Sequence, residues 1–258
     1  FGAQFMRIIG KTDIGRNRAE NQDTFRSGTL RGSGGWGVVC DGMGGAQNGK
    51  LASAVAADCI EEMIFQQMSD TTPTPEEDAL LPGQVLRDSI RLANAEVYAR
   101  SGDGDRLMGT TVVCALVWQG VLHLAHVGDS RAYLYEDGAL TQITRDHSMV
   151  QELVDQGALT SDEASRHPER NVITRALGVE PEVECSQSER PISAGAVVLL
   201  CSDGLTGQLS KERLTAALRE TDFYDLPRVL VNQALEAGGN DNITVLVMQP
   251  GEEDVQRG

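Results

Sequence analysis

Four aspartates, each at one end of a strongly apolar run, are the feature that most restricts how this chain can fold. Asp41 follows WGVVC, Asp129 follows HLAHVG, Asp203 follows VVLLCS, and Asp241 precedes NITVLVM. A carboxylate at the end of a buried strand lies at the rim of a sheet, where burial without a partner is costly. A single Asp beside Gly is usually a turn residue. Four such residues, far apart in the sequence, instead indicate a cluster that only the tertiary fold assembles.

Clustered carboxylates repel one another unless cations are bound among them. Ligands that are all oxygen, in a chain with only four histidines, favour Mg²⁺ or Mn²⁺ over Zn²⁺. Two such ions, roughly 3.5–4 Å apart, lower the pKa of a bridging water and hold a phosphoryl group between them. The aspartate pattern therefore predicts a metal site suited to phosphate chemistry.

The formal net charge of −16, from 38 acidic and 22 basic residues, limits the partners of the chain. An acidic surface repels nucleic-acid backbones, so we expect no nucleic-acid partner. An anionic substrate would need a local positive charge, which bound divalent cations supply. No apolar run approaches the roughly 18 residues of a membrane-spanning helix, so we expect no membrane partner for this segment. Five cysteines without a C-x-x-C pair fit reduced thiols in a cytoplasmic protein.

Apolar periodicity divides the chain into short strands and amphipathic helices. Runs rich in Val, Leu and Ile predict strands at Gly37–Cys40, Thr111–Trp118, Val121–Val127, Ala132–Glu136, Ala196–Cys201 and Thr244–Met248. Apolar residues three and four positions apart predict helices at Asn48–Met68, Val85–Arg100, Ser210–Glu220 and Asp225–Ala237. Strands that lie between two pairs of helices indicate an α+β domain whose sheets are covered by helices.

Three segments fall outside this pattern. Residues 69–83 are rich in Thr, Pro and Glu and predict a loop. Residues 146–175, called the flap below, have short helical patterns and a Thr160-x-x-Glu163 capping box but little apolar content, which indicates a surface subdomain. Residues 1–5 precede Met6 and are interpreted as a remnant of cloning. We expect a single domain over residues 1–258.

Six motifs carry a resemblance to a known family: TDIGRNRAENQD, VVCDGMGG, GTTVVCALV, VGDSRAYLY, LLCSDGLTG and GGNDNITVLVM. In this order, from about Arg7 to Met248, they resemble the metal-dependent protein phosphatases of type 2C, and the DGMGG form is similar to the bacterial branch. The resemblance implies a four-layer α-β-β-α sandwich, with two central antiparallel sheets flanked by helices and the flap beside the site.

The resemblance also implies an activity. Members of the family hydrolyse phosphoserine and phosphothreonine by means of a metal-activated water at a binuclear centre. The expected substrates are phosphorylated proteins, either a Ser/Thr kinase or its targets, so that the enzyme opposes kinase signalling. An anti-sigma-factor antagonist is the alternative substrate within the family, and a monomer is the default expectation.

The resemblance assigns metal-binding roles to five residues. Asp41 would bridge two Mn²⁺ or Mg²⁺ ions, and the Gly42 carbonyl would help to hold one of them. Asp203 and Asp241 would complete the ligands of the second ion, so Asp41, Asp203 and Asp241 form the catalytic core. Asp129 would hold a third, weaker ion together with Asp203.

Two further residues match the N-terminal motif, and three positions depart from the family pattern. Arg18 matches the arginine that grips the substrate phosphate, and a guanidinium offers paired donors that fit a phosphate. Asp23 would order metal-bound water. The departures are Gln22, where Glu is common, Met43, where other members have histidine, and Ala46, where many bacterial members have histidine.

These departures leave open which group protonates the leaving oxygen. His147 and His167 in the flap are candidates, although a flap histidine is more often simply exposed. Protonation by metal-bound water is the preferred alternative. His126 lies within a predicted strand, and we expect it to be a packed core residue.

Other chemistries fit the sequence less well. The Gly128-Asp129-Ser130 motif resembles that of a serine esterase, but no histidine base follows His167. Cys185 and Arg190 are one residue short of the spacing of a cysteine-based phosphatase. Residues 103–105 hint at a calcium loop but are followed by apolar residues where ligands are needed. The stronger rival is a pseudophosphatase that binds without catalysis, and metal-stimulated turnover discriminates it from the enzyme.

Overall fold

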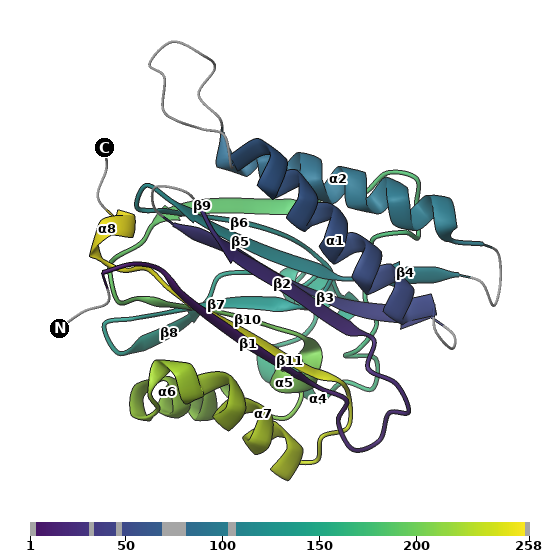
Figure 1. The fold of residues 1–258 in the computed structure, drawn as a ribbon. Helices are drawn as coiled ribbons and strands as arrows, with labels where there is room; N and C mark the ends of the chain where they lie inside the picture. The colour runs from purple at the N-terminus through teal and green to yellow at the C-terminus, as the bar shows by residue number, and fades with distance from the viewer. Residues whose placement is uncertain (1–3, 31–33, 45–47, 69–80, 103–106, 256–258) are drawn as a thin grey trace.

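Two antiparallel sheets lie face to face in the computed structural model, which describes residues 4–30, 34–44, 48–68, 81–102 and 107–255 (Figure 1). The first sheet has the strand order β1-β11-β10-β7-β8, and the second has the order β2-β3-β5-β6-β9, with β4 paired to β3. The strands of the first sheet are β1 (Arg7–Asp13), β7 (Arg131–Glu136), β8 (Ala139–Gln142), β10 (Val197–Cys201) and β11 (Ile243–Gln249). Those of the second are β2 (Asp23–Thr29), β3 (Gly35–Gly44), β4 (Met108–Thr110), β5 (Val112–Trp118), β6 (Val121–Val127) and β9 (Ser186–Pro191).

The space between the sheets is filled by apolar side chains that alternate along the central strands. In β3, Val39 packs in the cluster between the sheets, whereas Val38 and Cys40 pack in the cluster under the helices. Successive residues of a strand point to opposite faces, so a strand covered on both faces is apolar at every position. The continuous runs VVLLC of β10 and ITVLVM of β11 follow from this double burial.

Two pairs of helices complete the sandwich, as Figure 1 shows. Helices α1 (Asn48–Met68) and α2 (Pro82–Arg100) cover the second sheet, and α6 (Lys211–Glu220) and α7 (Leu226–Glu236) cover the first. Shorter helical turns are α5 (Asp203–Thr206), η2 (Phe223–Asp225) and α8 (Glu252–Val255). The predicted α+β, four-layer architecture is confirmed. Among the described residues, no helix combines the length and apolar character needed to cross a membrane.

The sequence patterns missed the more polar strands of the sheets. β1, β2 and β9 lie at sheet edges, and their side chains are mostly half-buried or exposed, so they lack a long apolar run. β3 continues to Gly44, so the prediction that this strand ends at Cys40 is wrong. It continues because its last residues pair with β4. Pro82 and Gly83 belong to α2 rather than to the predicted loop, and the rest of that loop up to residue 80 lies outside the described residues.

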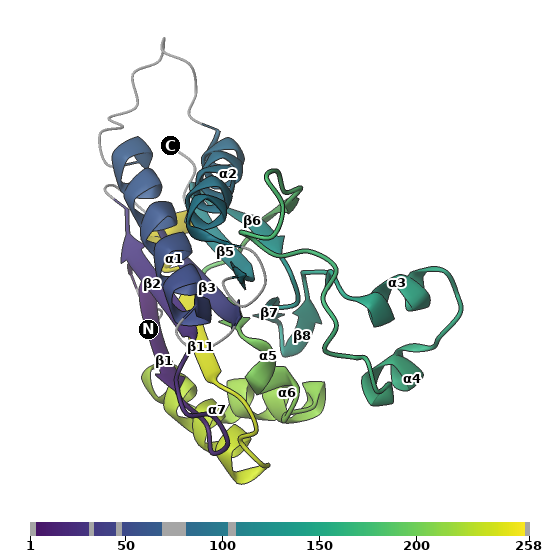
Figure 2. The ribbon, with the colours of Figure 1, turned by 90° about the vertical axis from the view of Figure 1, so that its right-hand side faces the viewer.

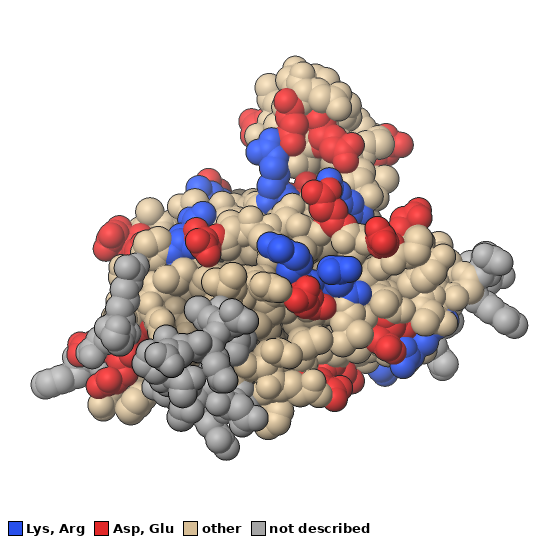
Figure 3. Space-filling model, turned by 90° about the horizontal axis from the view of Figure 1, so that it is seen from above, with Lys and Arg blue, Asp and Glu red and all other residues tan. Residues whose placement is uncertain are grey.

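The flap projects from one side of the sandwich (Figure 2) and contains α3 (Met149–Asp155) and α4 (Ser161–Arg166). The Thr160–Glu163 capping box is present at the start of α4, as predicted. At the base of the flap, the Met149 N–H donates to the Val172 carbonyl oxygen at 2.9 Å, so the two chains that enter and leave it are paired. Acidic side chains are prominent on this projecting lobe (Figure 3).

Candidate active site

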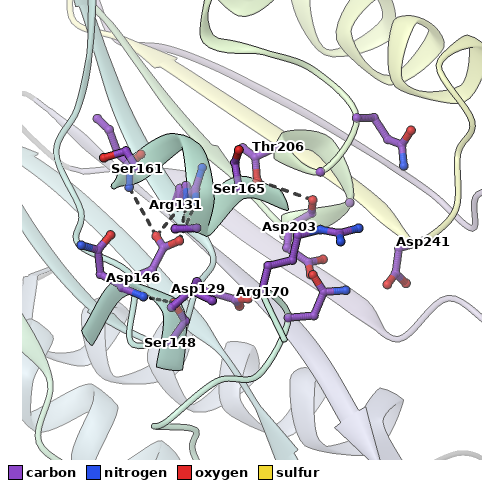
Figure 4. Close-up of a pocket in the computed structure, with 18 of the residues that line it drawn as sticks. Asp129, Arg131, Asp146, Ser148, Ser161, Ser165, Arg170, Asp203, Thr206 and Asp241 are labelled. Carbon is purple, nitrogen blue, oxygen red and sulfur yellow. Dashed lines mark hydrogen bonds and ion pairs between the residues drawn. The ribbon is translucent and has the colours of Figure 1, made fainter. Parts of the chain in front are cut away.

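The four aspartates lie around one polar pocket at the end of both sheets. Asp41 is in β3, Asp129 follows β6, Asp203 begins α5, and Asp241 precedes β11. All four line a pocket of about 260 Å³. Asp129, Asp203 and Asp241 also line an adjoining pocket of about 470 Å³ that extends between α5 and the flap (Figure 4). Residues more than 150 positions apart in sequence are thus brought together by the strand order.

Close backbone packing explains the glycines that follow two of these aspartates. A β-carbon on Gly42 would lie 2.0 Å from the Gly49 carbonyl oxygen. A β-carbon on Gly204 would lie 1.9 Å from the Asn242 carbonyl oxygen. Real β-carbons do not approach so closely, so only glycine allows α1 and the chain before β11 to pack against the site.

Hydrogen bonds also tie the strands of the site together. The Thr111 N–H donates to the Asp41 carbonyl oxygen at 2.9 Å, and the Asp41 N–H donates to Thr111 Oγ1 at 3.1 Å. Thr111 Oγ1 lies 2.7 Å from Ser130 Oγ, next to Asp129. The backbones that carry Asp41 and Asp129 are therefore held in a fixed relation to each other.

Burial and mutual repulsion raise the pKa values of the clustered carboxyl groups. Burial is the main cause at Asp41, whose pKa lies well above its ordinary value because Asp23, Asp203 and Asp129 are also close. Burial, followed by repulsion from Asp203, raises the pKa of Asp129 to about 7. The pKa of Asp203 rises for the same reason, burial first and then repulsion from Asp241. The neighbouring Asp41 carboxyl group and the guanidinium of Arg18 act in the opposite direction on Asp203.

Asp23 is buried beside this cluster, and only one of its two carboxylate oxygens accepts hydrogen bonds from described residues. Its Oδ2 accepts hydrogen bonds from Ser202 Oγ at 2.8 Å and from Thr244 Oγ1 at 2.6 Å. Its Oδ1 is buried and has no hydrogen-bond partner among the described residues. Burial raises the pKa of Asp23 to about 6, although the two hydroxyl groups act in the opposite direction.

Arg18 lies in the loop before β2 and lines the smaller pocket. Its Nη2 lies 2.6 Å from Asp241 Oδ2, and the hydrogen bond to this carboxylate raises the pKa of the guanidinium. The Arg18 side chain is 53% exposed, so the ion pair alone contributes little to stability. Its position is more informative, because the guanidinium borders the aspartate cluster and still faces solvent.

The residues present fit a divalent cation. Asp203 Oδ1 is buried without a hydrogen-bond partner among the described residues, as is Asp23 Oδ1, and an unpaired buried carboxylate oxygen is costly. The donor set consists of carboxylates and nearby carbonyl groups, which suits Mg²⁺ or Mn²⁺. Over the residues that the structure describes, no three acidic, histidine or cysteine side chains converge on one ion position. Water, and for one ion the Gly42 carbonyl, would therefore have to complete the ligands.

The histidines occupy places that the sequence did not all predict. His126 is buried, as expected for a core residue. His147 is also buried, with 9% of its surface exposed, and the expectation of an exposed flap histidine is wrong for it. Its ring accepts a hydrogen bond from the backbone of Gly128 and contacts Ser186, because it lies at the flap base rather than on the flap surface. Neither His147 nor His167 lines either pocket.

Two flap residues reach the site without a sequence signal that could have identified them. Asn171 lines both pockets, and Ile173 lines the smaller one. Gln22 and Met43, two of the departures from the family pattern, also line the smaller pocket. The third departure, Ala46, and the calcium-loop hint at residues 103–105 lie outside the described residues.

Comparisons with known proteins agree with this geometry. The protein phosphatase 2C family matches residues 9–238. The serine/threonine phosphatase Stp of Listeria monocytogenes is 36% identical over 246 residues, which cover 93% of this chain and 94% of that protein. The crystal structure of the serine/threonine phosphatase PstP/Ppp of Mycobacterium tuberculosis has a TM-score of 0.84 and 36% identity, covering 96% of this chain and 99% of that chain. The catalytic domain of PstP in complex with two manganese ions has a TM-score of 0.80 and 35% identity, with coverage of 96% and 99%. The chain belongs to the protein phosphatase 2C family.

Proposed function

We propose that this chain is a metal-dependent protein phosphatase that hydrolyses phosphoserine and phosphothreonine. The observation that carries the proposal is the convergence of four carboxylates and one arginine on a single pocket. Its relatives are named as serine/threonine phosphatases, and one of them is in complex with two manganese ions. The roles of the individual residues below are part of this proposal.

Asp41, Asp203 and Asp241 are the proposed ligands of the two core ions, and the Gly42 carbonyl assists them. Asp129 is the proposed ligand of a third, weaker ion, which it would share with Asp203. When bound, Mn²⁺ or Mg²⁺ supplies positive charge to the phosphate oxygens and an activated water as the nucleophile. The acidic cluster alone would repel a phosphate, so this charge is needed for the substrate to bind.

Arg18 is the proposed phosphate-binding residue. Its planar guanidinium can donate two parallel hydrogen bonds to phosphate oxygens. In the structure its Nη2 pairs with Asp241, and other N–H donors of the guanidinium can meet the substrate phosphate. Asp23 is proposed to orient water in the pocket through its unpartnered Oδ1, since its other oxygen is fixed by two hydroxyl groups.

The reaction adds the oxygen of water to phosphorus and breaks the bond between phosphorus and the Ser or Thr oxygen. The products are inorganic phosphate and the free hydroxyl side chain, whose oxygen needs one proton. Because neither flap histidine lines the pockets, we propose that water, rather than His147 or His167, delivers this proton.

The remaining parts of the proposal concern the setting of the enzyme. We propose a single domain in which the flap contributes Asn171 and Ile173 to the wall of the substrate pocket. Its substrates are proposed to be phosphorylated Ser/Thr kinases or their targets. The cytoplasm is the proposed compartment, since all five cysteines are free and reducing compartments keep thiols in this state. A monomer is the proposed assembly.

The test is release of inorganic phosphate from a phosphothreonine peptide, with Mn²⁺ and with EDTA. We expect Mn²⁺-dependent turnover, and Asp203→Asn should lower it by more than the roughly 10–100-fold typical of residues that only support a metal ligand. Asp137→Asn is the matched control, because Asp137 is exposed in the turn between β7 and β8 at a φ of 51°, which asparagine tolerates well. Absence of Mn²⁺-stimulated turnover in the wild-type protein would instead support the pseudophosphatase.

A further inference from the structure

His147 lies where three parts of the molecule meet. Its Nδ1 accepts a hydrogen bond from the Gly128 N–H at 3.1 Å, and its Nε2 lies 2.9 Å from Ser186 Oγ. Its backbone N–H donates to the Gly128 carbonyl oxygen at 2.9 Å, and its carbonyl oxygen accepts from the Thr174 N–H at 2.9 Å. This residue therefore joins the turn before Asp129, the start of β9, and the chain that leaves the flap.

These contacts determine the protonation of the ring. Since Nδ1 accepts a hydrogen bond, the single ring proton of His147 is on Nε2, from which it is donated to Ser186 Oγ. The His126 ring stacks on it, with centroids 4.7 Å apart and planes 10° apart. The Nε2 of His126 lies 2.8 Å from the Arg145 carbonyl oxygen, which can only accept, so His126 also carries its proton on Nε2. Two neutral rings can stack in this buried place, whereas two charged rings would repel each other.

The backbone on either side of Asp129 is held by separate groups. Gly128 has a φ of 103°, and a β-carbon there would lie 2.7 Å from Thr111 Cγ2. The Gly128 N–H and carbonyl are both bonded to His147, whereas Ser130 Oγ lies 2.7 Å from Thr111 Oγ1. The turn that carries Asp129 is thus tied to His147 on one side and to Thr111 on the other.

The part of the smaller pocket that Asn171 and Ile173 line, called the flap wall below, is also connected to His147. Ile173 and Ser148 pair as an isolated antiparallel β-bridge, and the Met149 N–H donates to the Val172 carbonyl oxygen. Asn171 and Ile173, at the edge of this paired base, line the smaller pocket. Because His147 belongs to the same base and also holds the Gly128 backbone, its ring and its backbone together join the flap wall to the turn before Asp129.

We propose that His147 is a positioning residue that aligns the flap wall of the substrate pocket with the turn that carries Asp129. This inference rests on the proposed phosphatase function. It concerns binding of the peptide around the phosphorylated residue, not the chemistry at phosphorus. On this proposal a phosphopeptide reaches the flap wall, whereas the small substrate p-nitrophenyl phosphate needs only the aspartates and Arg18. The His147 N–H bond to the Gly128 carbonyl oxygen belongs to the backbone, so it remains in the side-chain variants and keeps the turn that carries Asp129 in place.

The kinetic test compares these two substrates in His147→Leu and His147→Asn. For His147→Leu we expect the KM of the phosphopeptide to rise about tenfold, the scale of one lost buried hydrogen bond, and that of p-nitrophenyl phosphate to change less than about twofold. Asparagine places an acceptor near the position of Nδ1, so His147→Asn should recover part of the loss. His167→Leu is the matched control and should behave as wild type, because, among the residues that the structure describes, the His167 ring accepts a hydrogen bond only from the Glu169 N–H in its own turn.

Ser186→Ala removes only the outer contact of the ring and should give a smaller rise in the phosphopeptide KM. If His147→Leu does not fold, Ser186→Ala replaces it in the comparison of the two substrates. Equal rises for both substrates, or no rise for either in His147→Leu, would overturn the assignment of His147 to the flap wall.

A second readout does not depend on activity. In ¹⁵N NMR spectra of the metal-free wild-type protein near neutral pH, His147 should show a protonated Nε2 and an unprotonated Nδ1. The Gly128 amide should exchange slowly with solvent, and at least about tenfold faster in His147→Leu. A proton on Nδ1, or unchanged Gly128 exchange in the variant, would contradict the inference. Lack of Mn²⁺-stimulated turnover by the wild-type protein would refute the proposed phosphatase function and leave these spectra as the separate test of the His147 contacts.

Discussion

Metal binding to the aspartate cluster should release protons, and the number released should depend strongly on pH. In the metal-free site the pKa of Asp129 is about 7 and that of Asp23 is about 6. At pH 6 these two groups therefore hold about 0.9 and 0.5 of a proton, and at pH 8 about 0.1 in total, as follows from simple titration. A bound cation favours the ionised carboxylates, so it should release about one more proton per chain at pH 6 than at pH 8.

The same titration gives the change in affinity. The release from Asp129 and Asp23 between pH 6 and pH 8 would by itself raise the apparent affinity for Mn²⁺ about twentyfold. Asp41 and Asp203, whose pKa values are also raised, act in the same direction. Isothermal titration calorimetry in pairs of buffers with different ionisation enthalpies measures both quantities. Asp129→Asn should reduce the pH dependence, because asparagine does not titrate. Equal proton release at pH 6 and pH 8 in the wild-type protein would refute the argument that burial and repulsion raise these pKa values.

Further predictions follow from single contacts. Arg18→Ala should raise the KM for phosphopeptides about 10–100-fold, the scale of a lost charge-assisted hydrogen-bond pair, and steady-state kinetics with an unchanged KM would remove Arg18 from the phosphate site. Gly204→Ala should lower the melting temperature strongly, because the new β-carbon would lie 1.9 Å from the Asn242 carbonyl oxygen. Its control is Gly83→Ala in α2, where the new β-carbon meets nothing closer than 3.8 Å and should stabilise the protein by about 0.5–1 kcal/mol. Equal melting temperatures for the two variants would count against the packing argument. Burial, followed by the neighbouring imidazole, lowers the pKa of His147 from 6.5 to about 4. The stability that neutral His147 contributes is therefore present above pH 6.5 and lost as the pH falls toward 4. In urea titrations of the Mn²⁺-loaded protein, the free energy of unfolding should fall less over this range in His147→Asn than in the wild type. Identical pH profiles for the two proteins would contradict the assignment of this loss to His147.

The central strands and the four covering helices could be predicted from the sequence because burial leaves a clear pattern. A strand covered on both faces is apolar throughout, as in β10, and an amphipathic helix repeats its apolar residues, as in α1, whose predicted bounds Asn48–Met68 match the structure. β1, β2 and β9 carry no such pattern. They are defined by pairing with a neighbouring strand, which is a property of the tertiary fold.

Part of the candidate site could also be predicted from the sequence. Each aspartate could be found from the apolar strand beside it, but the strand order that brings Asp41 and Asp241 to one pocket could be expected only from the family resemblance. Asn171 could not be found, because its place in the pocket depends on how the flap base pairs. The same holds for His147, whose burial results from contacts with Gly128 and Ser186 that are distant in sequence.

Anomalous diffraction from crystals of the protein loaded with Mn²⁺ tests the central claim most directly. The account predicts two strong peaks in the smaller pocket, with the carboxylate oxygens of Asp41, Asp203 and Asp241 as ligands and the Arg18 guanidinium beside them. A third, weaker peak is expected at Asp129. Mn²⁺ peaks that lie elsewhere on the molecule, or a pocket without anomalous density at saturating Mn²⁺, would contradict the assignment of these aspartates as the metal centre.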